Sequence, residues 1–315
     1  MIKIANRFRP YSHEPGCRAL IPGSTHHVQA FPTLIRLFFD RTLLFEKSLP
    51  FTGPIKNFTL TQDLEKGILR LFGHAKEGYF VYKIYRLSDK ILIHSKQEID
   101  SIPITDRSFV KKPLERLSLG VHKAQEFEKI VKRASLNEWL PILFHLGQWM
   151  PTLHFPETLL RRLQSPSDWP ELFRGCFRSL FMPTLFDDHY LNIPQLNEMP
   201  PLDSPLSLIT ALHAQIRSLF IQPKKDHLNL LPSLSREIRS GRMIDVEGEG
   251  YRVDFEWTKG KLRRVFIKPF CDREVGFSLP RELKSFRMNK ERVLKRGERL
   301  FLKKNQLIFL DQFEK

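Results

Sequence analysis

Residues 58–94 carry the sequence FTLTQDLEKGILRLFGHAKEGYFVYKIYRLSDKILIH, in which short apolar and aromatic runs alternate with turn residues. The turn residues fall at 65–67, 75–78 and 87–90. Short runs rich in β-branched and aromatic residues, separated by Gly and Asp, are typical of antiparallel strands joined by tight turns. The stretch predicts a β-meander, and we expect residues 1–115 to form an N-terminal β-sandwich.

From residue 116 to residue 222 the apolar residues take the spacing of helices. Four segments place their apolar residues on one helical face: 124–132, 156–163, 168–181 and 207–219. Ser135 followed by Glu138 predicts a capping box at the start of a further helix, with Pro141 in its first turn. This region is expected to be a helical bundle or a partial helical toroid.

The spacing typical of strands returns in residues 223–315. Residues 251–257 alternate apolar and polar side chains, the Lys259-Gly260 pair supplies a turn, and residues 262–267 follow as a second strand. This pattern predicts a β-hairpin. The last region is therefore expected to be a small C-terminal β-domain, and the fold class is expected to be α+β.

The composition is that of a globular protein. Of the 315 residues 41% are hydrophobic and 27% are charged, which argues against a disordered chain. No apolar run approaches the roughly 18 residues that a membrane-spanning helix requires, so no membrane span is expected. Residues 1–10 lack the apolar segment of a secretory signal, and the sequence therefore predicts a cytoplasmic protein.

The three cysteines, Cys17, Cys176 and Cys271, are far apart in the sequence and form no C-x-x-C pair. Their number and spacing exclude a disulfide framework and a structural zinc ribbon, so each is expected to be a buried or half-buried reduced thiol. The sequence carries no motif for a nucleotide or another cofactor, and no cofactor is predicted.

The formal net charge is +16, which attracts polyanions such as nucleic acid, acidic glycans or an acidic membrane surface. Much of the positive charge lies in the C-terminal tail, which contains Arg281, Lys284, Arg287, Lys290, Arg292, Lys295, Arg296, Arg299, Lys303 and Lys304. These residues favour either a contact with an acidic polymer or a set of solvated strand faces with edge-protecting lysines.

The order of motifs after residue 207 resembles a known family. A predicted helix is followed by LLPSL at residues 230–234, by Gly241, and by GYRVDFEWTKGKL at residues 250–262. This order is similar to the C-terminal end of the α-L-fucosidase-like glycoside hydrolases of family 95, which are six-hairpin glycosidases. There a last barrel helix precedes an L-L-P-A-L-P segment, a glycine and a V-x-I-x-W-x-x-G-x-L hairpin. The turn at residues 63–68 is also similar to the L-D-L-x-T-G-x turn of that family's N-terminal sandwich.

The resemblance implies an inverting glycosidase with its site where the helical region meets the N-terminal sandwich. The family places a catalytic aspartate and a substrate-contacting asparagine in a D-A-N-F-G-type motif ahead of the last barrel helix. Asp203 falls on the aspartate position and would orient or activate the attacking water. Pro205 stands at the asparagine position, and the Phe-Gly pair is absent. The alternative interpretation of Asp203 is a helix N-cap.

Inversion also requires a carboxylic acid roughly 6.5–9.5 Å from the base. The candidates in the helical region are Glu157, Glu171, Asp187, Asp188 and Glu198. A toroid of about twelve helices of average length needs more residues than 117–221 provide, so the resemblance implies a reduced barrel.

Three further groups of residues carry ligand-binding side chains. His26 and His27 are adjacent, so on a strand they point to opposite faces and do not share a metal. Asp187, Asp188 and His189 offer metal-ligand types, with a solvated loop as the alternative. Residues 7–16 combine Arg, aromatic and His side chains, which indicates either a glycan-contact surface or a segment pinned to the sandwich.

Three functions follow as hypotheses. The first is a carbohydrate-active protein that hydrolyses or binds glycosidic substrates, with a saccharide as its ligand. The second is a non-catalytic scaffold that kept a reduced glycosidase fold. The third is a protein that binds acidic polymers through its basic tail. The sequence leaves the sugar, the linkage and the oligomeric state open.

Overall fold

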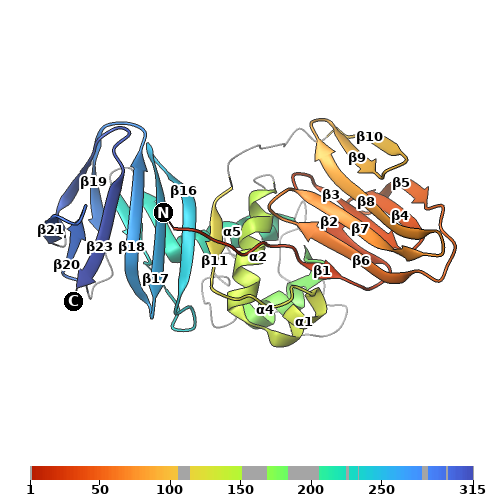
Figure 1. The fold of residues 1–315 in the computed structure, drawn as a ribbon, viewed down its shortest axis with the longest axis horizontal. Helices are drawn as coiled ribbons and strands as arrows, with labels where there is room; N and C mark the ends of the chain where they lie inside the picture. The colour runs from red at the N-terminus through yellow and green to blue at the C-terminus, as the bar shows by residue number, and fades with distance from the viewer. Residues whose placement is uncertain are drawn as a thin grey trace, which may run out of the picture.

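The computed structural model describes residues 2–105, 114–150, 169–183, 206–224, 227–232, 234–278, 283–295 and 297–314. Two strand-rich regions flank a group of helices (Figure 1). The fold is α+β, as predicted, and strands dominate it.

The N-terminal region contains two antiparallel sheets. The six-stranded sheet has the order β1-β6-β7-β8-β9-β10 and the four-stranded sheet the order β2-β3-β4-β5. The strands of the first are β1 (Tyr11–Ser12), β6 (Lys56–Asp63), β7 (Ile68–Ala75), β8 (Gly78–Leu87), β9 (Lys90–His94) and β10 (Ile99–Pro103). The strands of the second are β2 (Cys17–Leu20), β3 (His26–Phe31), β4 (Leu34–Phe39) and β5 (Thr42–Ser48).

The predicted meander is confirmed as β6 to β9, because alternate residues of these strands are buried. Leu69 and Leu71 of β7 and Tyr82 and Ile84 of β8 lie in the core. Hydrogen bonds join the two sheets: Gln62 donates to the carbonyl of Leu20 over 2.8 Å. The N-terminal core is therefore shared between both sheets.

The helices lie between the two strand-rich regions (Figure 1). They are α1 (Phe127–Arg133), α2 (Leu136–Gln148), α4 (Trp169–Cys176) and α5 (Ser207–Phe220), with a small hairpin of β12 (Phe177–Arg178) and β13 (Met182–Pro183) after α4. Helix α2 is buried along almost its whole length and packs against α5, where the rings of Phe144 and His213 lie 4.8 Å apart. An aromatic cluster around Trp139, Phe173 and Phe181 joins α2, α4 and the hairpin.

Three details of the predicted helices are wrong. Ser135 is the N-cap of α2, but its side chain makes no capping hydrogen bond, and the Glu138 side chain pairs with Arg133 instead of completing a capping box. Pro141 lies inside α2 rather than in its first turn. The helix predicted over 168–181 ends at Cys176, where the β12–β13 hairpin begins. The helix predicted at 156–163 lies outside the described residues.

The C-terminal region contains a seven-stranded sheet of order β11-β16-β17-β18-β23-β20-β21 and a four-stranded sheet of order β14-β15-β19-β22. The first consists of β11 (Arg116–Ser118), β16 (Gly241–Gly248), β17 (Tyr251–Thr258), β18 (Lys261–Pro269), β23 (Ile308–Glu314), β20 (Ser285–Met288) and β21 (Arg292–Lys295). The second consists of β14 (Ile221–Lys224), β15 (His227–Leu230), β19 (Arg273–Ser278) and β22 (Arg299–Leu302). The predicted hairpin around Lys259-Gly260 is confirmed as β17 and β18, with positive φ angles of 52° and 73° at its two turn residues.

Two segments distant in sequence connect these regions. Strand β11 follows the N-terminal sheets in the chain and yet pairs with β16 at the edge of the C-terminal sheet. Residues 2–8 run beside the helices toward the same sheet, where Arg242 donates to the carbonyl of Lys3 over 3.0 Å (Figure 1). The described part of the chain contains no helix long and apolar enough to cross a membrane.

Candidate functional site

Most of the predicted catalytic residues lie outside the residues that the structure describes. Asp203, Pro205 and four of the five candidate acids, Glu157, Asp187, Asp188 and Glu198, lie outside the described residues, as does His189. Glu171 lies on α4, and its side chain is likewise outside the description. The predicted inverting pair therefore stays a prediction.

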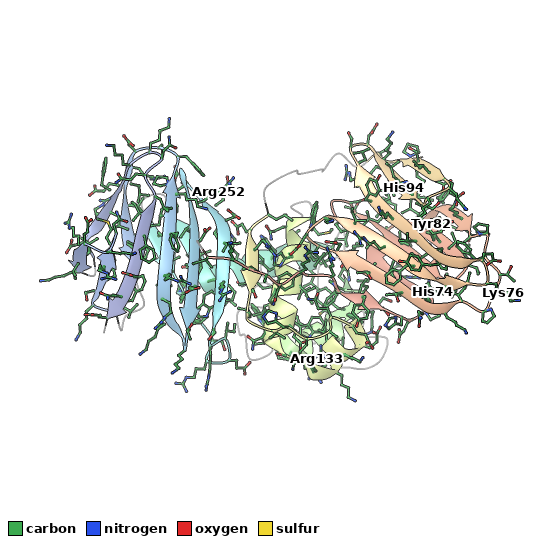
Figure 2. All side chains as sticks on the ribbon, viewed as in Figure 1. His74, Lys76, Tyr82, His94, Arg133 and Arg252 are labelled. Atoms are coloured by element: carbon green, nitrogen blue, oxygen red, sulfur yellow. The ribbon has the colours of Figure 1, made fainter. Side chains whose placement is uncertain are left out.

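The described carboxylates of the helical region each bond to a neighbouring side chain. Glu138 accepts two hydrogen bonds from Arg133, with a shortest N–O distance of 2.5 Å, and Figure 2 shows Arg133 at the edge of this region. Glu126 pairs with Lys129 over 2.6 Å, and Glu128 accepts a hydrogen bond from Ser12 over 2.7 Å. These contacts hold helix α1 to its surroundings and give the three carboxylates structural roles.

Residues 7–16 are pinned to the protein, which favours the second of the two interpretations of this segment. Phe8 is buried and stacks on His145 with a centroid distance of 4.3 Å. Arg9 forms an ion pair of 2.8 Å with the buried Asp63, and the His13 ring lies 3.0 Å from the hydroxyl of Thr59. These side chains are occupied by contacts within the protein.

His26 and His27 lie on β3 and contact the rings of Phe39 and Phe38 on opposite faces of the sheet, as predicted. Burial lowers the pKa of His27 to about 4, so its ring is neutral near pH 7. Within the described ranges no three His, Cys, Asp or Glu side chains are grouped closely enough to hold a metal ion.

The three cysteines are free thiols, as predicted. Cys17 and Cys176 are buried, and burial raises the pKa of each to about 12. Because the thiolate is the nucleophilic form, these two side chains are not suited to covalent catalysis. Cys271 is exposed, so its predicted burial is wrong.

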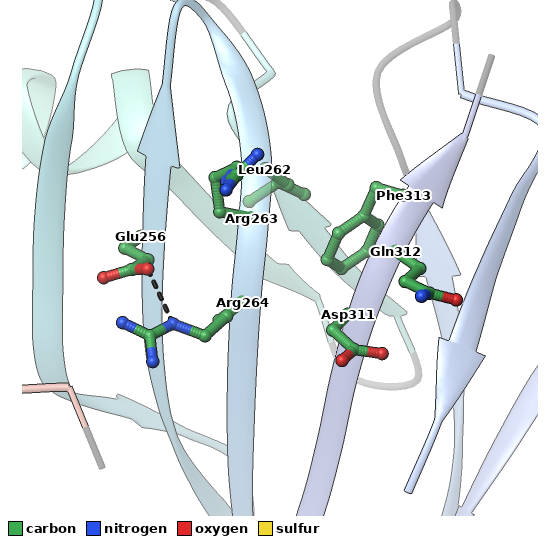
Figure 3. A pocket seen from close by; sticks show the side chains of 7 residues that line it. All are labelled: Glu256, Leu262, Arg263, Arg264, Asp311, Gln312 and Phe313. Carbon is green, nitrogen blue, oxygen red and sulfur yellow. Dashed lines mark hydrogen bonds and ion pairs between the residues drawn. The ribbon is translucent and has the colours of Figure 1, made fainter. Parts of the chain in front are cut away.

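A groove lies in the C-terminal seven-stranded sheet, where β18 and β23 diverge. The two strands pair from Val265–Ile267 to Ile308–Leu310, after which β23 continues against β20. The opening has a volume of about 500 Å³. It is lined by Glu256, Leu262, Arg263, Arg264, Asp311, Gln312 and Phe313 (Figure 3).

Two ion-pair systems stand on either side of this groove. On one side Arg264 donates to Glu256 over 2.7 Å, and Arg242 approaches the same carboxylate at 3.5 Å (Figure 3). On the other side Arg287 contacts both oxygens of Asp311 at 2.9 Å. Bidentate and charge-assisted contacts fix these groups in place while leaving some of their donors and acceptors for a ligand.

The charge state of Asp311 suits binding and not acid catalysis. Its hydrogen bonds with Arg287 hold the pKa of the carboxyl below its ordinary value, and the same contact raises the pKa of the Arg287 guanidinium. The general acid of a glycosidase requires a raised pKa. Asp311 is therefore an acceptor of hydrogen bonds near neutral pH.

Aromatic rings complete the surface of the groove. Phe313 lines it and packs against Phe286 with a centroid distance of 6.0 Å. Phe266 and Phe309 lie side by side on the same sheet face as Arg264 and Asp311, with centroids 4.8 Å apart. Fixed polar groups beside aromatic faces form a surface that can bind hydroxyls and stack on an apolar ring.

Glu256 and Arg264 belong to the hairpin that the sequence predicts, but no sequence motif assigned either residue to a functional site. A groove formed by diverging strands depends on the register between β18 and β23, and 38 residues lie between the end of β18 at Pro269 and the start of β23 at Ile308. The one sequence feature that indicates these residues is that their charged side chains lie on the outer face of strands whose inner face is apolar.

No known protein family matches the chain, and no curated protein sequence is similar to it.

Proposed function

We propose that this chain is a carbohydrate-active protein related to the six-hairpin glycoside hydrolases, and that the groove between β18 and β23 binds a saccharide. In this proposal the two N-terminal sheets are a β-sandwich, the helices are a reduced barrel, and the C-terminal sheets are the family's small β-domain. The motif order around residues 230–262 and the sequence of strand-rich, helical and strand-rich regions support this relationship.

The groove is the observation that carries the binding function. Arg264 and Asp311 offer fixed donors and acceptors on opposite walls, Gln312 is an exposed lining residue on β23, and Phe313 presents a ring. Sugars combine many hydroxyls with apolar ring faces, and these wall groups complement both features. A volume of about 500 Å³ lies within the range typical of small-ligand sites, roughly 300–1,000 Å³.

Calorimetric titration with a panel of oligosaccharides tests the binding function, with wild type beside Gln312→Ala and Phe313→Ala. We expect at least one saccharide to bind wild type and to bind each variant about tenfold more weakly, since one lost buried contact costs about 1–1.5 kcal/mol. Phe301→Ala is the matched control, because Phe301 is an exposed ring on β22 outside the groove. Absence of binding by every saccharide would leave the scaffold as the better hypothesis.

Hydrolysis at Asp203 is a separate part of the proposal. Asp203 lies four positions before Ser207, the first residue of α5, which corresponds to the last barrel helix in the resemblance. Turnover of aryl glycosides and natural oligosaccharides is to be compared between wild type and Asp203→Asn. A fall of about 10²-fold or more in the variant would support catalysis. The alternative role of Asp203 as the helix N-cap is wrong, because Leu206 is the N-cap of α5. Equal turnover in the two proteins would exclude Asp203 from catalysis, and no turnover in either would restrict the proposal to binding.

A further inference from the structure

Four exposed cations lie in or beside the β17–β18 hairpin, next to the residues that line the groove. Lys259 occupies the turn, and Lys261 follows it at the start of β18. Arg239 is held beside the turn because its carbonyl accepts a 2.8 Å hydrogen bond from the amide of Gly260. Arg263 lines the groove itself. We call these four residues the hairpin cations.

The hairpin cations differ from the arginines of the two ion-pair systems beside the groove, because the hairpin cations have no acidic partner at ion-pair distance among the described residues. Arg264 and Arg242 share Glu256, and Arg287 is paired with Asp311. Across the part of the chain that the structure describes, none of the four hairpin cations forms an ion pair within 4.0 Å, and all four are exposed. The nearest acidic residue in the sequence is Glu237, which is itself exposed. The hairpin cations therefore carry uncompensated positive charge.

Building on the saccharide function proposed above, we propose that the groove binds an acidic saccharide, with its hydroxyls between Arg264 and Asp311 and its anionic group on the hairpin cations. The anionic group is a carboxylate, as in a uronic acid, or a sulfate. Both are recognised by clustered Lys and Arg side chains through charge-assisted hydrogen bonds.

The groove chemistry favours an acidic saccharide over a nucleic acid. The carboxylates Glu256 and Asp311 face the opening and are paired with arginines, so the walls of the groove do not present the continuous row of unpaired cations that a row of phosphates requires. The same carboxylates accept hydrogen bonds from sugar hydroxyls, which carry no charge. A ligand that is neutral along the groove and anionic at one end matches this distribution of charge.

The hairpin cations also provide a more localised site than the basic tail as a whole. Several tail arginines are neutralised by carboxylates: Arg292 lies 3.6 Å from Glu298, and Arg299 lies 3.5 Å from Glu274. The proposed anion site is therefore the β17–β18 hairpin, which precedes the tail in sequence.

The test uses the full chain and compares a neutral oligosaccharide that ends in a single uronic acid with the methyl ester of the same oligosaccharide, which has the same sugar rings without the charge. The same neutral oligosaccharide with one terminal sulfate supplies the second acidic ligand, and a short single-stranded DNA supplies phosphates. We expect one of the two acidic saccharides to bind about tenfold more tightly than the neutral ester, since each exposed ion contact contributes a factor of about two to five.

The decisive variant is Arg239→Gln/Lys259→Asn/Lys261→Gln, which leaves every lining residue of the groove unchanged and in which Asn accommodates the positive φ of the turn. It should lose the preference for the acidic form while keeping its affinity for the ester. The matched control Lys284→Gln/Lys303→Gln/Lys304→Gln removes the same charge from exposed positions elsewhere in the C-terminal region and should keep the preference.

The outcomes separate this inference from the proposed function. Equal binding of acidic and neutral saccharides, or an unchanged preference in the hairpin variant, would overturn the acidic ligand and leave the saccharide groove intact. Failure of every saccharide to bind would overturn both. Binding of DNA as tight as that of the acidic saccharides, lost in the hairpin variant, would replace the inference with a nucleic-acid site.

Discussion

Gly241 and Trp257 are opposite each other on β16 and β17, and their contact explains two positions of the motif that resembles the glycosidase family. A Cβ atom on Gly241 would lie 2.4 Å from the Trp257 indole, which is buried and donates to the carbonyl of Ile238 over 3.3 Å. Glycine is required here because the indole occupies the space of a side chain. The motif therefore encodes packing of the C-terminal sheet.

Gly241→Ala is expected to destabilise the protein by about 2–3 kcal/mol, because an added carbon in a packed core displaces its neighbours. Gly260→Ala is the control: nothing lies within 4 Å of its added Cβ, so only the backbone strain of φ 73° remains, about 1 kcal/mol. Urea denaturation measures both. An equal loss of stability in the two variants would mean that the indole moves aside without cost.

His145 and His27 link stability to pH, because both are buried and uncharged in the folded protein. Burial lowers the pKa of His145 to about 3 and that of His27 to about 4, below the ordinary value of 6.5. Unfolding then takes up protons below pH 6.5. The contribution of these two neutral histidines to the free energy of unfolding is therefore fully present above pH 6.5. It is lost progressively as the pH falls toward the pKa values of about 4 and about 3 in the folded protein.

Below about pH 6 the free energy of unfolding should fall by up to about 1.4 kcal/mol per pH unit for each of these histidines. His145→Gln keeps a donor for the carbonyl of Pro141 and removes one titrating group. Urea unfolding at a series of pH values should therefore give a slope smaller by one proton in the variant. Identical slopes in the two proteins would contradict a neutral buried His145.

Glu115 joins the helices to the C-terminal sheet. Its carboxylate accepts hydrogen bonds from Arg217 of α5 at 2.8 and 2.9 Å and from the amide of Glu247 of β16 at 3.0 Å. Gln148 of α2 donates to its carbonyl over 2.9 Å. The side chain of Glu115 thus connects α5 to the sheet edge, and its backbone connects the same residue to α2.

Glu115→Gln should lower the free energy of unfolding by about 2–3 kcal/mol, because the guanidinium of Arg217 loses its charged partner in a largely buried place. Glu274→Gln provides a comparison, since Glu274 pairs with Arg299 at 3.5 Å and both side chains are about half exposed. That second change should cost less than about 1 kcal/mol. Thermal or urea denaturation that ranks the two variants in the reverse order would contradict this role of Glu115.

The sequence predicts elements whose side chains repeat with a local period. The strands β6 to β9, the β17–β18 hairpin and α5 were predicted to within three residues at each end, because alternation or helical spacing continues through each of them. The capping box at Ser135 failed because a local motif cannot show that Arg133 competes for Glu138. The groove could not be predicted at all, since it arises from the pairing of β23 with two different strands.

Residues 2–8 connect all three regions of the molecule and have no regular secondary structure. Ile2, Ile4 and Phe8 are buried. Arg116 of β11 donates to the carbonyls of Ile4 and Asn6 over 3.2 and 2.8 Å, and Asn6 donates to the carbonyl of Val121 over 2.7 Å. This segment therefore contributes apolar contacts and hydrogen bonds at the junction between the sheets and the helices.

Deletion of residues 2–8 should lower the melting temperature by several degrees and separate the unfolding of the N-terminal and C-terminal regions. The reason is that the deletion removes three buried apolar side chains, each of which contributes about 1.5–3 kcal/mol, and takes the two carbonyl acceptors away from Arg116, which in the described part of the chain keeps only its contact with Glu65. Calorimetry should show one transition in wild type and two in the deletion variant. Lys3→Ala is the control, because the exposed Lys3 side chain is removed while its carbonyl still accepts from Arg242. A single transition at the wild-type temperature after the deletion would show that β11 and Glu115 suffice to couple the two ends of the molecule.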